Sequence, residues 1–167
     1  MTKEKNTNTS NLSFLEKKQV LKQTSLFSET PDSVLDDMVN ILHIKTYQAG
    51  DSIFYKGNIG NSMYIIYRGE IRIHEDDHTF AILKKGNIFG ELSLLDPEPR
   101  SATATVLQNC LVFMVAQKDF YEIASKRPEI MKGILTILAR RLRSQNKHVV
   151  NLKGQVSWMF SKFHDIY

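Results

Sequence analysis

The chain has 167 residues, of which 42% are hydrophobic and 24% are charged. These proportions are typical of one globular domain and exclude a wholly disordered protein. No uninterrupted apolar run approaches the roughly 20 residues of a membrane-spanning helix, and the single cysteine excludes an internal disulfide. The net charge of +4 is unevenly distributed, because residues 126–153 hold eight basic residues and one acidic residue.

The first 42 residues combine a polar leader with two predicted helices. Residues 1–11 contain no apolar stretch, which predicts a disordered leader and not a secretory signal. A helical spacing of apolar residues begins at Leu12, and Thr30-Pro31 has the chemistry that opens a second helix. The expected apolar face of that helix consists of Val34, Leu35, Met38, Val39 and Leu42.

The segment 43–116 contains six of the eight glycines and a series of short runs typical of β-strands. In one of them Ile71 and Ile73 alternate with Arg72 and His74, a period of two that buries one face of a strand. The predicted strands are 52–55, 62–68, 70–74, 79–83, 101–107 and 110–116. Short strands separated by turns predict an antiparallel barrel or sandwich.

Helical spacing returns after residue 117. A short helix is expected at 119–125, and Pro128 opens a long one. Along the long helix, apolar residues recur at alternating intervals of three and four and form a seam, in which Gln145 is the one polar member. The apolar members are Leu135, Leu138, Leu142, Val149, Leu152, Val156 and Met159. This seam predicts a homodimer through Leu135, Leu138, Leu142, Val149 and Leu152. Gly154 is expected to end or bend the helix, which leaves a helical tail at 154–167.

The stretch from Phe89 to Ala102 is the most informative about chemistry. Gly90 allows the backbone to approach a ligand closely, and a short helix after it would present free amides to an anion. Arg100 follows a stiff loop with two prolines, where its planar guanidinium can be held against a phosphate. Glu91 would repel a phosphate but accept a hydrogen bond from a sugar hydroxyl. These residues favour a nucleotide with one phosphate charge, because the stretch lacks the lysine and magnesium ligands of a triphosphate site.

Two motifs carry a resemblance to a known family. Phe89-Gly90-Glu91, followed by Pro99-Arg100-Ser101-Ala102, resembles the phosphate-binding cassette of the cyclic nucleotide-binding domain family, and the resemblance extends from about Leu26 to Leu152. It implies an α+β fold in which a jelly-roll-like antiparallel β-roll of about eight strands carries a short cassette helix and a long C-terminal helix. The implied domain, 12–153, is divided into N-terminal helices at 12–42, the β-roll at 43–116 and lid or dimer helices at 117–153.

The same resemblance implies roles for individual residues. Gly90 and Glu91 would contact the ribose 2′-hydroxyl. The cyclic phosphate would be held by Arg100, Ser101 and the amides near Leu92, Ser93 and Ala102. Residues expected near the base or in a lid over it are Leu83, Arg141, Gln145 and Asn146. The implied ligand is a cyclic mononucleotide, and neither a metal nor another cofactor is implied.

The identity of the base depends on positions where the chain departs from the family. Ser93 replaces the usual alanine, which should be tolerated because the family uses the backbone there. Gln145 and Asn146 align with residues that contact adenine in one relative, but Gln145 is equally well explained as a polar residue that fixes the register of a coiled coil. Ser101 is compatible with either base. We expect cAMP in preference to cGMP.

Several polar residues also have simpler interpretations. Glu91 and Arg100 alone would suit an ion pair, and only the full motif favours a binding site. The run His74 to His78 holds two histidines and three acids, but its place between two strands predicts a solvated hairpin tip and not a metal site. Cys110 lies in an apolar run, which predicts a small buried side chain.

The motifs favour a binding protein over an enzyme. No phosphate-binding loop, zinc-protease motif or nucleophile arrangement is present, so no catalysis is expected. The resemblance implies a cytoplasmic sensor that relays ligand binding through its C-terminal helix to an unknown partner.

Two alternatives stay open: a dimeric interaction module with a vestigial pocket, and a regulator whose basic helix contacts nucleic acid. Specific DNA recognition is not expected, because the 14 residues from Gly154 to Tyr167 are too few for a helix-turn-helix.

Overall fold

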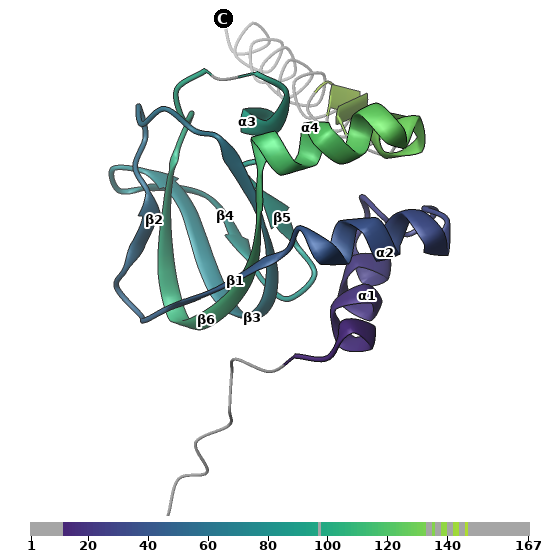
Figure 1. Ribbon diagram of the computed structural model, residues 1–167. Helices are drawn as coiled ribbons and strands as arrows, with labels where there is room; N and C mark the ends of the chain where they lie inside the picture. Colours follow the sequence, from purple (N-terminus) through teal and green to yellow (C-terminus); the bar gives the residue numbers. More distant parts are fainter. Residues whose placement is uncertain are drawn as a thin grey trace, which may run out of the picture.

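A computed structural model describes residues 12–96, 98–132, 135, 138, 139, 142, 143 and 146. It confirms the α+β fold class, with an antiparallel sheet rolled up beside a layer of helices (Figure 1). The helices are α1 (Phe14–Gln23), α2 (Asp32–Asn40), α3 (Leu92–Leu95) and α4 (Gln117–Lys126). The strands are β1 (His43–Tyr47), β2 (Ser52–Phe54), β3 (Ser62–Glu75), β4 (His78–Leu83), β5 (Ile88–Phe89) and β6 (Thr103–Ala116).

The sheet is built around two long strands. The order of the main path is β1-β6-β3-β4, while β2 pairs with β6 and β5 pairs with β3, and every pairing is antiparallel. β3 and β6 each have 14 residues and pair from Ser62 opposite Ala116 to His74 opposite Thr103. This ladder places the start of β6, and the loop before it, beside the far half of β3 and its partner β4.

The described residues form six strands, fewer than the eight or so that the family resemblance implies, and two of them, β1 and β5, lie outside the predicted runs. The runs 62–68 and 70–74 are one strand, β3, and the runs 101–107 and 110–116 are another, β6. The two runs in β3 are joined at Gly69, which has a φ of +102°. It packs so closely on β6 that a Cβ at this position would lie 2.5 Å from the Cβ of Cys110. Gly69 therefore serves a bulge within a continuous strand and not a turn between two strands.

The N-terminal helices form where the sequence predicts them. Ser13 caps α1 through a capping box, in which its hydroxyl accepts from the Glu16 amide and its own amide donates to the Glu16 carboxylate. α2 follows Pro31 and buries the expected apolar face, which comprises Val34, Leu35, Met38 and Val39. Both helices therefore present apolar side chains to the sheet.

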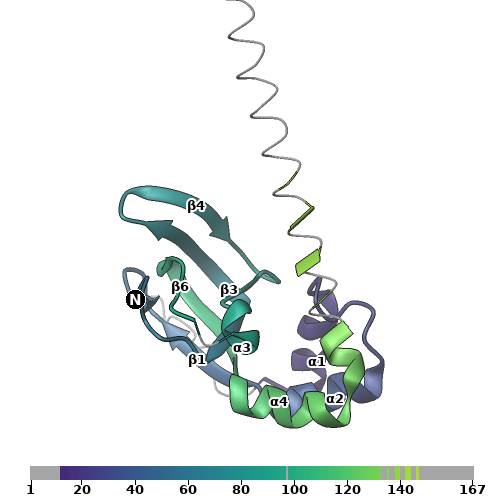
Figure 2. The ribbon, with the colours of Figure 1, turned by 90° about the horizontal axis from the view of Figure 1, so that it is seen from above.

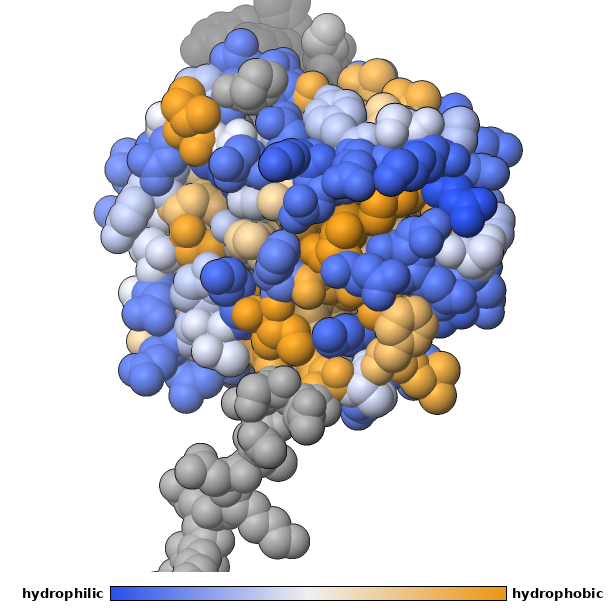
Figure 3. Space-filling model, in the orientation of Figure 1, coloured by the Kyte–Doolittle hydropathy of each residue, from blue (hydrophilic) through white to orange (hydrophobic). Residues whose placement is uncertain are grey.

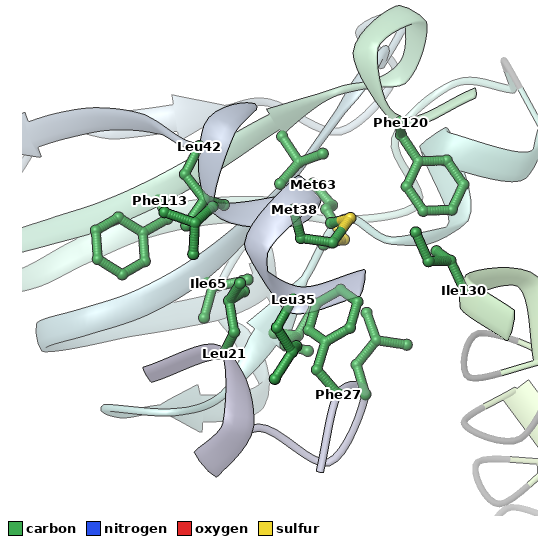
Figure 4. Close-up of a cluster of buried hydrophobic side chains, with 14 of the residues drawn as sticks. Leu21, Phe27, Leu35, Met38, Leu42, Met63, Ile65, Phe113, Phe120 and Ile130 are labelled. Atoms are coloured by element: carbon green, nitrogen blue, oxygen red, sulfur yellow. The ribbon is translucent and has the colours of Figure 1, made fainter. Parts of the chain in front are cut away.

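Two hydrophobic clusters make up the core. The larger lies between the helices and the sheet and includes Leu21, Phe27, Met38, Phe113 and Phe120 (Figure 4). Viewed from above, α1, α2 and α4 lie together on one side of the roll, away from the β3–β4 hairpin (Figure 2). On the face shown in Figure 3, hydrophobic residues gather near the junction of helices and sheet, within an otherwise mostly hydrophilic surface.

The smaller cluster fills the inside of the β-roll and contains Cys110. This side chain is 3% exposed, and burial raises the pKa of its thiol to about 11. The prediction of a small buried side chain at this position is therefore confirmed.

Beyond α4 the described residues continue as a helix from Pro128, as predicted. Leu138 is partly buried against the larger cluster, whereas Leu135 and Leu142 are exposed. Other predictions for the seam fall on Val149 and Leu152, which lie outside the described residues, as do the leader 1–11 and the tail 154–167. Among the described residues, no helix has the length and apolar character needed to cross a membrane.

Candidate functional site

A cavity of about 560 Å³ lies between α3, the β3–β4 hairpin and the start of β6. The residues predicted to hold ribose and phosphate, Gly90 to Ser93 and Arg100 to Ala102, all line it, and so does Leu83. These residues come from four separate segments: β4, the β5–α3 junction, α3 and the loop before β6. The fold therefore brings the cassette residues together around one cavity.

Arg100 is the buried cation of this cavity, with 7% of its surface exposed. One arm of the guanidinium, Nη1, donates to the Ser93 hydroxyl at 2.8 Å and to the Gly90 carbonyl at 3.2 Å. The other arm, Nη2, donates to the carbonyl of Ser62 at 2.7 Å and lies 3.4 Å from its hydroxyl. All four acceptors are neutral, so the hydrogen bonds fix the side chain without cancelling its charge.

Two glycines leave room for the guanidinium. Gly90 has a φ of +72°, and a Cβ there would lie 2.6 Å from Arg100 Nη1. A Cβ at Gly60 would lie 2.5 Å from Arg100 Nε and 2.4 Å from the Ser93 hydroxyl. The close approach of backbone to arginine at these two positions requires the absence of a side chain.

Aromatic rings support the arginine from inside the roll. The Phe54 ring lies beneath its guanidinium, 4.1 Å from Cζ to the ring centroid, a cation–π contact. Phe54 in turn packs on Tyr64 and Phe89, whose rings stack with centroids 5.1 Å apart. The plane of the guanidinium thus packs on the Phe54 ring, while its N–H groups donate to the surrounding oxygen atoms.

The electrostatics of the site combine one buried cation and one buried acid. Glu91 is 5% exposed and lines the same cavity. Burial lowers the pKa of Arg100, whereas Tyr64 and Glu91 act in the opposite direction. Since the ordinary pKa of arginine lies far above neutrality, Arg100 stays charged. The cavity thus offers a cation for an anionic group and a carboxylate for a hydroxyl.

The remaining wall of the cavity is apolar. Ile73 of β3 together with Ala81 and Leu83 of β4 lines it, opposite the cassette. These three residues face inward because side chains alternate along each strand, and their neighbours Phe80 and Ile82 are exposed. A flat, apolar ring system fits such a surface.

α3 is also attached to α4, outside the cavity. The side-chain amide of Gln117 donates to the carbonyls of Ser93 at 3.1 Å and Leu94 at 3.2 Å. The Tyr121 hydroxyl donates to the carbonyl of Leu95 at 3.4 Å. The carbonyl end of the cassette helix is therefore anchored on the helix that leads to the C-terminal segment.

The structure does not bring every predicted site residue to the cavity. Asn146 is an exposed helical residue outside its lining, and Arg141 and Gln145 lie outside the described residues. Sequence reasoning missed the roles of Ser62, Phe54 and Gln117, which touch the cassette or its arginine from elsewhere in the chain. No local signal marks these roles, because they depend on pairing between distant segments.

Two other polar regions lie apart from the cassette residues. The His74–His78 run forms the tip between β3 and β4 as predicted, and His74 bonds to the Thr105 hydroxyl and the Asp76 carbonyl. Within the described part of the chain, no group of three or more metal-binding side chains comes together. A second cavity of about 600 Å³, lined by Arg68 and Asp51 among others, contains none of the predicted site residues.

The chain is similar to proteins of a known family. The model of the cyclic nucleotide-binding domain matches residues 44–127, half of the chain. A cyclic AMP receptor protein from Thermus thermophilus is 29% identical over 128 residues, which are 74% of this chain and 59% of that protein. The chain spans about three fifths of the length of such curated relatives.

Solved structures show the same likeness. The N-terminal domain of a transcriptional regulator from Streptomyces coelicolor has a TM-score of 0.68 and 30% identity, covering 78% of this chain and 94% of that one. The regulatory domain of Toxoplasma gondii PKA, crystallised with cAMP, has a TM-score of 0.62 and 25% identity, covering 70% and 48%. With the matching cassette and cavity, these findings show that the chain belongs to the cyclic nucleotide-binding domain family, whose domain is a regulatory fold.

Proposed function

We propose that this chain is a non-catalytic sensor that binds a cyclic mononucleotide, cAMP in preference to cGMP, in the cavity beside α3. The observation that carries the proposal is Arg100, a buried cation whose hydrogen-bond acceptors are all neutral, placed in a cavity of nucleotide size. A buried cation is costly; Glu91 in the same cavity offsets part of this cost, and a negative charge on a ligand would offset more of it. The proposed ligand supplies that charge.

The phosphate and the ribose are assigned to different ends of the cassette. A cyclic phosphodiester carries one negative charge, which Arg100 would balance, and Ser101 and the amides of Leu92, Ser93 and Ala102 would complete its hydrogen bonds. The buried carboxylate of Glu91 would accept a hydrogen bond from the ribose 2′-hydroxyl, next to the backbone of Gly90. A linear nucleotide with a dianionic phosphate is disfavoured, because Glu91 would repel the additional charge.

The base is assigned to the apolar wall formed by Ile73, Ala81 and Leu83. These side chains offer surface to a purine but no hydrogen bonds that would select one. Two of the relatives support the preference for cAMP, since the names of the Thermus thermophilus receptor protein and of the Toxoplasma gondii complex specify cAMP, while other relatives are cGMP-dependent kinases by name. The lid residues Arg141, Gln145 and Asn146 remain part of the proposal.

Ligand binding would be relayed through α4. The phosphate would bind between Arg100 and α3, and Gln117 anchors α3 on α4. A ligand that favours one position of α3 would therefore shift the populations of α4 and of the helix that follows it. We propose that a cytoplasmic partner protein reads this change, and that no chemical step occurs in this domain.

We further propose that the chain forms a homodimer through its C-terminal helix. Leu135 and Leu142, one heptad apart, are 60% and 59% exposed, so both offer apolar surface that a second helix would bury in a dimer. Leu138, between them, is already partly covered by the domain itself. Light scattering at micromolar concentration is expected to give the mass of a dimer, and a monomeric mass would contradict this part of the proposal.

Thermal unfolding with cAMP, cGMP and linear AMP, measured side by side, tests the proposed function. A ligand at 100 times its Kd stabilises the folded state by about 2.7 kcal/mol. We expect the largest rise in Tm with cAMP, a smaller one with cGMP and none with AMP. No rise with either cyclic nucleotide would favour a vestigial pocket, and equal rises with cAMP and AMP would rule out recognition of the cyclic phosphate.

A further inference from the structure

Ser93 occupies an unusual position in the cassette helix. Only 5% of its surface is exposed. Its hydroxyl accepts a hydrogen bond from Arg100 Nη1 at 2.8 Å, and its main-chain carbonyl accepts one from Gln117 at 3.1 Å. Ser93 therefore accepts hydrogen bonds both from the cation of the site and from Gln117, the side chain that anchors α3 on α4.

The hydroxyl has a particular effect on the guanidinium. Each arm of Arg100 makes one short bond and one longer one: Nη1 to Ser93 and Gly90, and Nη2 to the carbonyl and hydroxyl of Ser62. The two short bonds, 2.8 Å and 2.7 Å, lie on opposite arms of a rigid planar group. Two points of attachment fix the rotation of a plane, whereas one does not. An alanine in place of Ser93 would leave Nη1 with the 3.2 Å contact to Gly90 alone.

The surroundings hold the hydroxyl itself in place. The backbone of Gly60 lies against it so closely that a Cβ there would be 2.4 Å away. The backbone of Ser93 is held by the bond from Gln117 to its carbonyl. Because both ends of the residue are restrained, its oxygen can serve as a fixed reference point for the arginine.

We propose that the Ser93 hydroxyl is a positioning group for Arg100, which orients the guanidinium for the phosphate before the ligand arrives. This inference rests on the proposed function of the cavity. It adds an affinity-determining side chain at a position where the family motif offers only backbone. Fixing a binding group in advance increases affinity because less conformational freedom is lost on binding.

Calorimetric titration of cAMP into the full chain, four single variants and one double variant tests the proposal. We expect Ser93→Ala to bind about tenfold more weakly, in line with the loss of a hydrogen bond to a charged group. Ser93→Thr restores the hydroxyl and is expected to recover most of the affinity. Ser52→Ala is the matched control, since it removes a hydroxyl that contacts Thr105 outside the cavity and should leave the affinity unchanged.

The fourth variant, Arg100→Lys, separates positioning from a general structural role. Lysine keeps the charge but has no planar fork to orient. In this background the further change Ser93→Ala should cost less than about twofold in affinity. A full tenfold loss there, a Ser93→Thr variant as weak as Ser93→Ala, or a Ser93→Ala variant that binds like the parent would each overturn the positioning role. A parent chain that binds no cyclic nucleotide would overturn the proposed function itself, and this inference with it.

Discussion

Arg100 and Lys18 are both cations held by several partners, but the partners differ in charge. Arg100 donates to two main-chain carbonyls and two hydroxyls inside the β-roll. Lys18 lies between the carboxylates of Asp36, at 2.7 Å, and Asp32, at 3.4 Å, where α1 meets α2. A cation among neutral acceptors keeps its charge for an incoming anion, whereas a cation among carboxylates has already been neutralised.

The two cations also differ in the burial of their surroundings. Arg100 is buried in the wall of the cavity, and this burial lowers the pKa of the guanidinium. Around Lys18 the partner Asp32 is exposed, and hydrogen bonds raise the pKa of the ammonium. A charge inside the fold is expensive to maintain, while an exposed pair contributes little. The first arrangement is therefore characteristic of binding and the second of joining two helices.

The largest expected effect concerns the two cations themselves. Arg100→Ala should weaken the binding of cAMP by 100-fold or more, because charge-assisted bonds contribute about 1.5–3 kcal/mol each and more than one is lost. Lys18→Ala, which removes a cation of the same charge from the helical layer, should bind cAMP as the parent does. Calorimetry measures both, and equal affinities of the Arg100→Ala variant and the parent would remove the distinction between the two regions.

Two glycine substitutions test whether the close packing around Arg100 affects ligand binding. We expect Gly90→Ala to bind cAMP about tenfold more weakly and Gly86→Ala to bind it as the parent does. Gly90→Ala combines a strained backbone, at a φ of +72°, with a methyl group 2.6 Å from Nη1. Gly86→Ala has the same kind of strain, at a φ of +83°, but meets nothing within 4 Å. Both variants should lose stability in chemical denaturation, and only Gly90→Ala should lose affinity. Equal losses of affinity would attribute the effect to strain alone.

A smaller effect is expected from the second serine of the arginine site. Ser62→Ala removes the 3.4 Å contact to Nη2 but keeps the 2.7 Å bond from Nη2 to the main-chain carbonyl. We expect the Kd for cAMP to rise only about twofold, since the lost contact is at the long end of the hydrogen-bond range. A loss as large as that of Arg100→Ala would show that the hydroxyls and not the carbonyls hold the cation.

The smallest effect is expected for Asp32, in the group of ion pairs between α1 and α2. A hydrogen bond from Lys22, with help from Lys18, lowers the pKa of Asp32 below its ordinary value. The folded state therefore gains stability above the ordinary pKa of about 4 and loses it as the pH falls through the lower, folded value. Asp32→Asn should show a slightly lower Tm than the parent near neutral pH, and the two should converge in acid. A difference that persists at the lowest pH would argue against the ion pair as its cause, and the affinity for cAMP should not change.

The cassette illustrates how much of the site local sequence can predict. Phe89 to Glu91 and Pro99 to Ala102 are recognisable in any context, since their spacing sets a turn, a short helix and an arginine on one loop. All seven cassette residues line the cavity, as does Leu83. The acceptors of Arg100 are less accessible to sequence reasoning, because Ser62 lies 38 residues away. Its approach depends on the register of β3 and on the path of the loop before β6.

Periodicity and contiguous motifs are enough to predict the α+β class, the buried faces of the helices and the position of the cassette. They do not predict that Gly69 lies in a bulge within a strand, that Gly60 leaves room for the arginine or that the Ser93 hydroxyl accepts a hydrogen bond from it. These outcomes depend on which distant segment packs against each residue. A glycine has the same local freedom at a turn and at a bulge, and an arginine has the same charge beside a carboxylate and beside a carbonyl. Only the neighbours supplied by the fold determine which of these functions the residue performs.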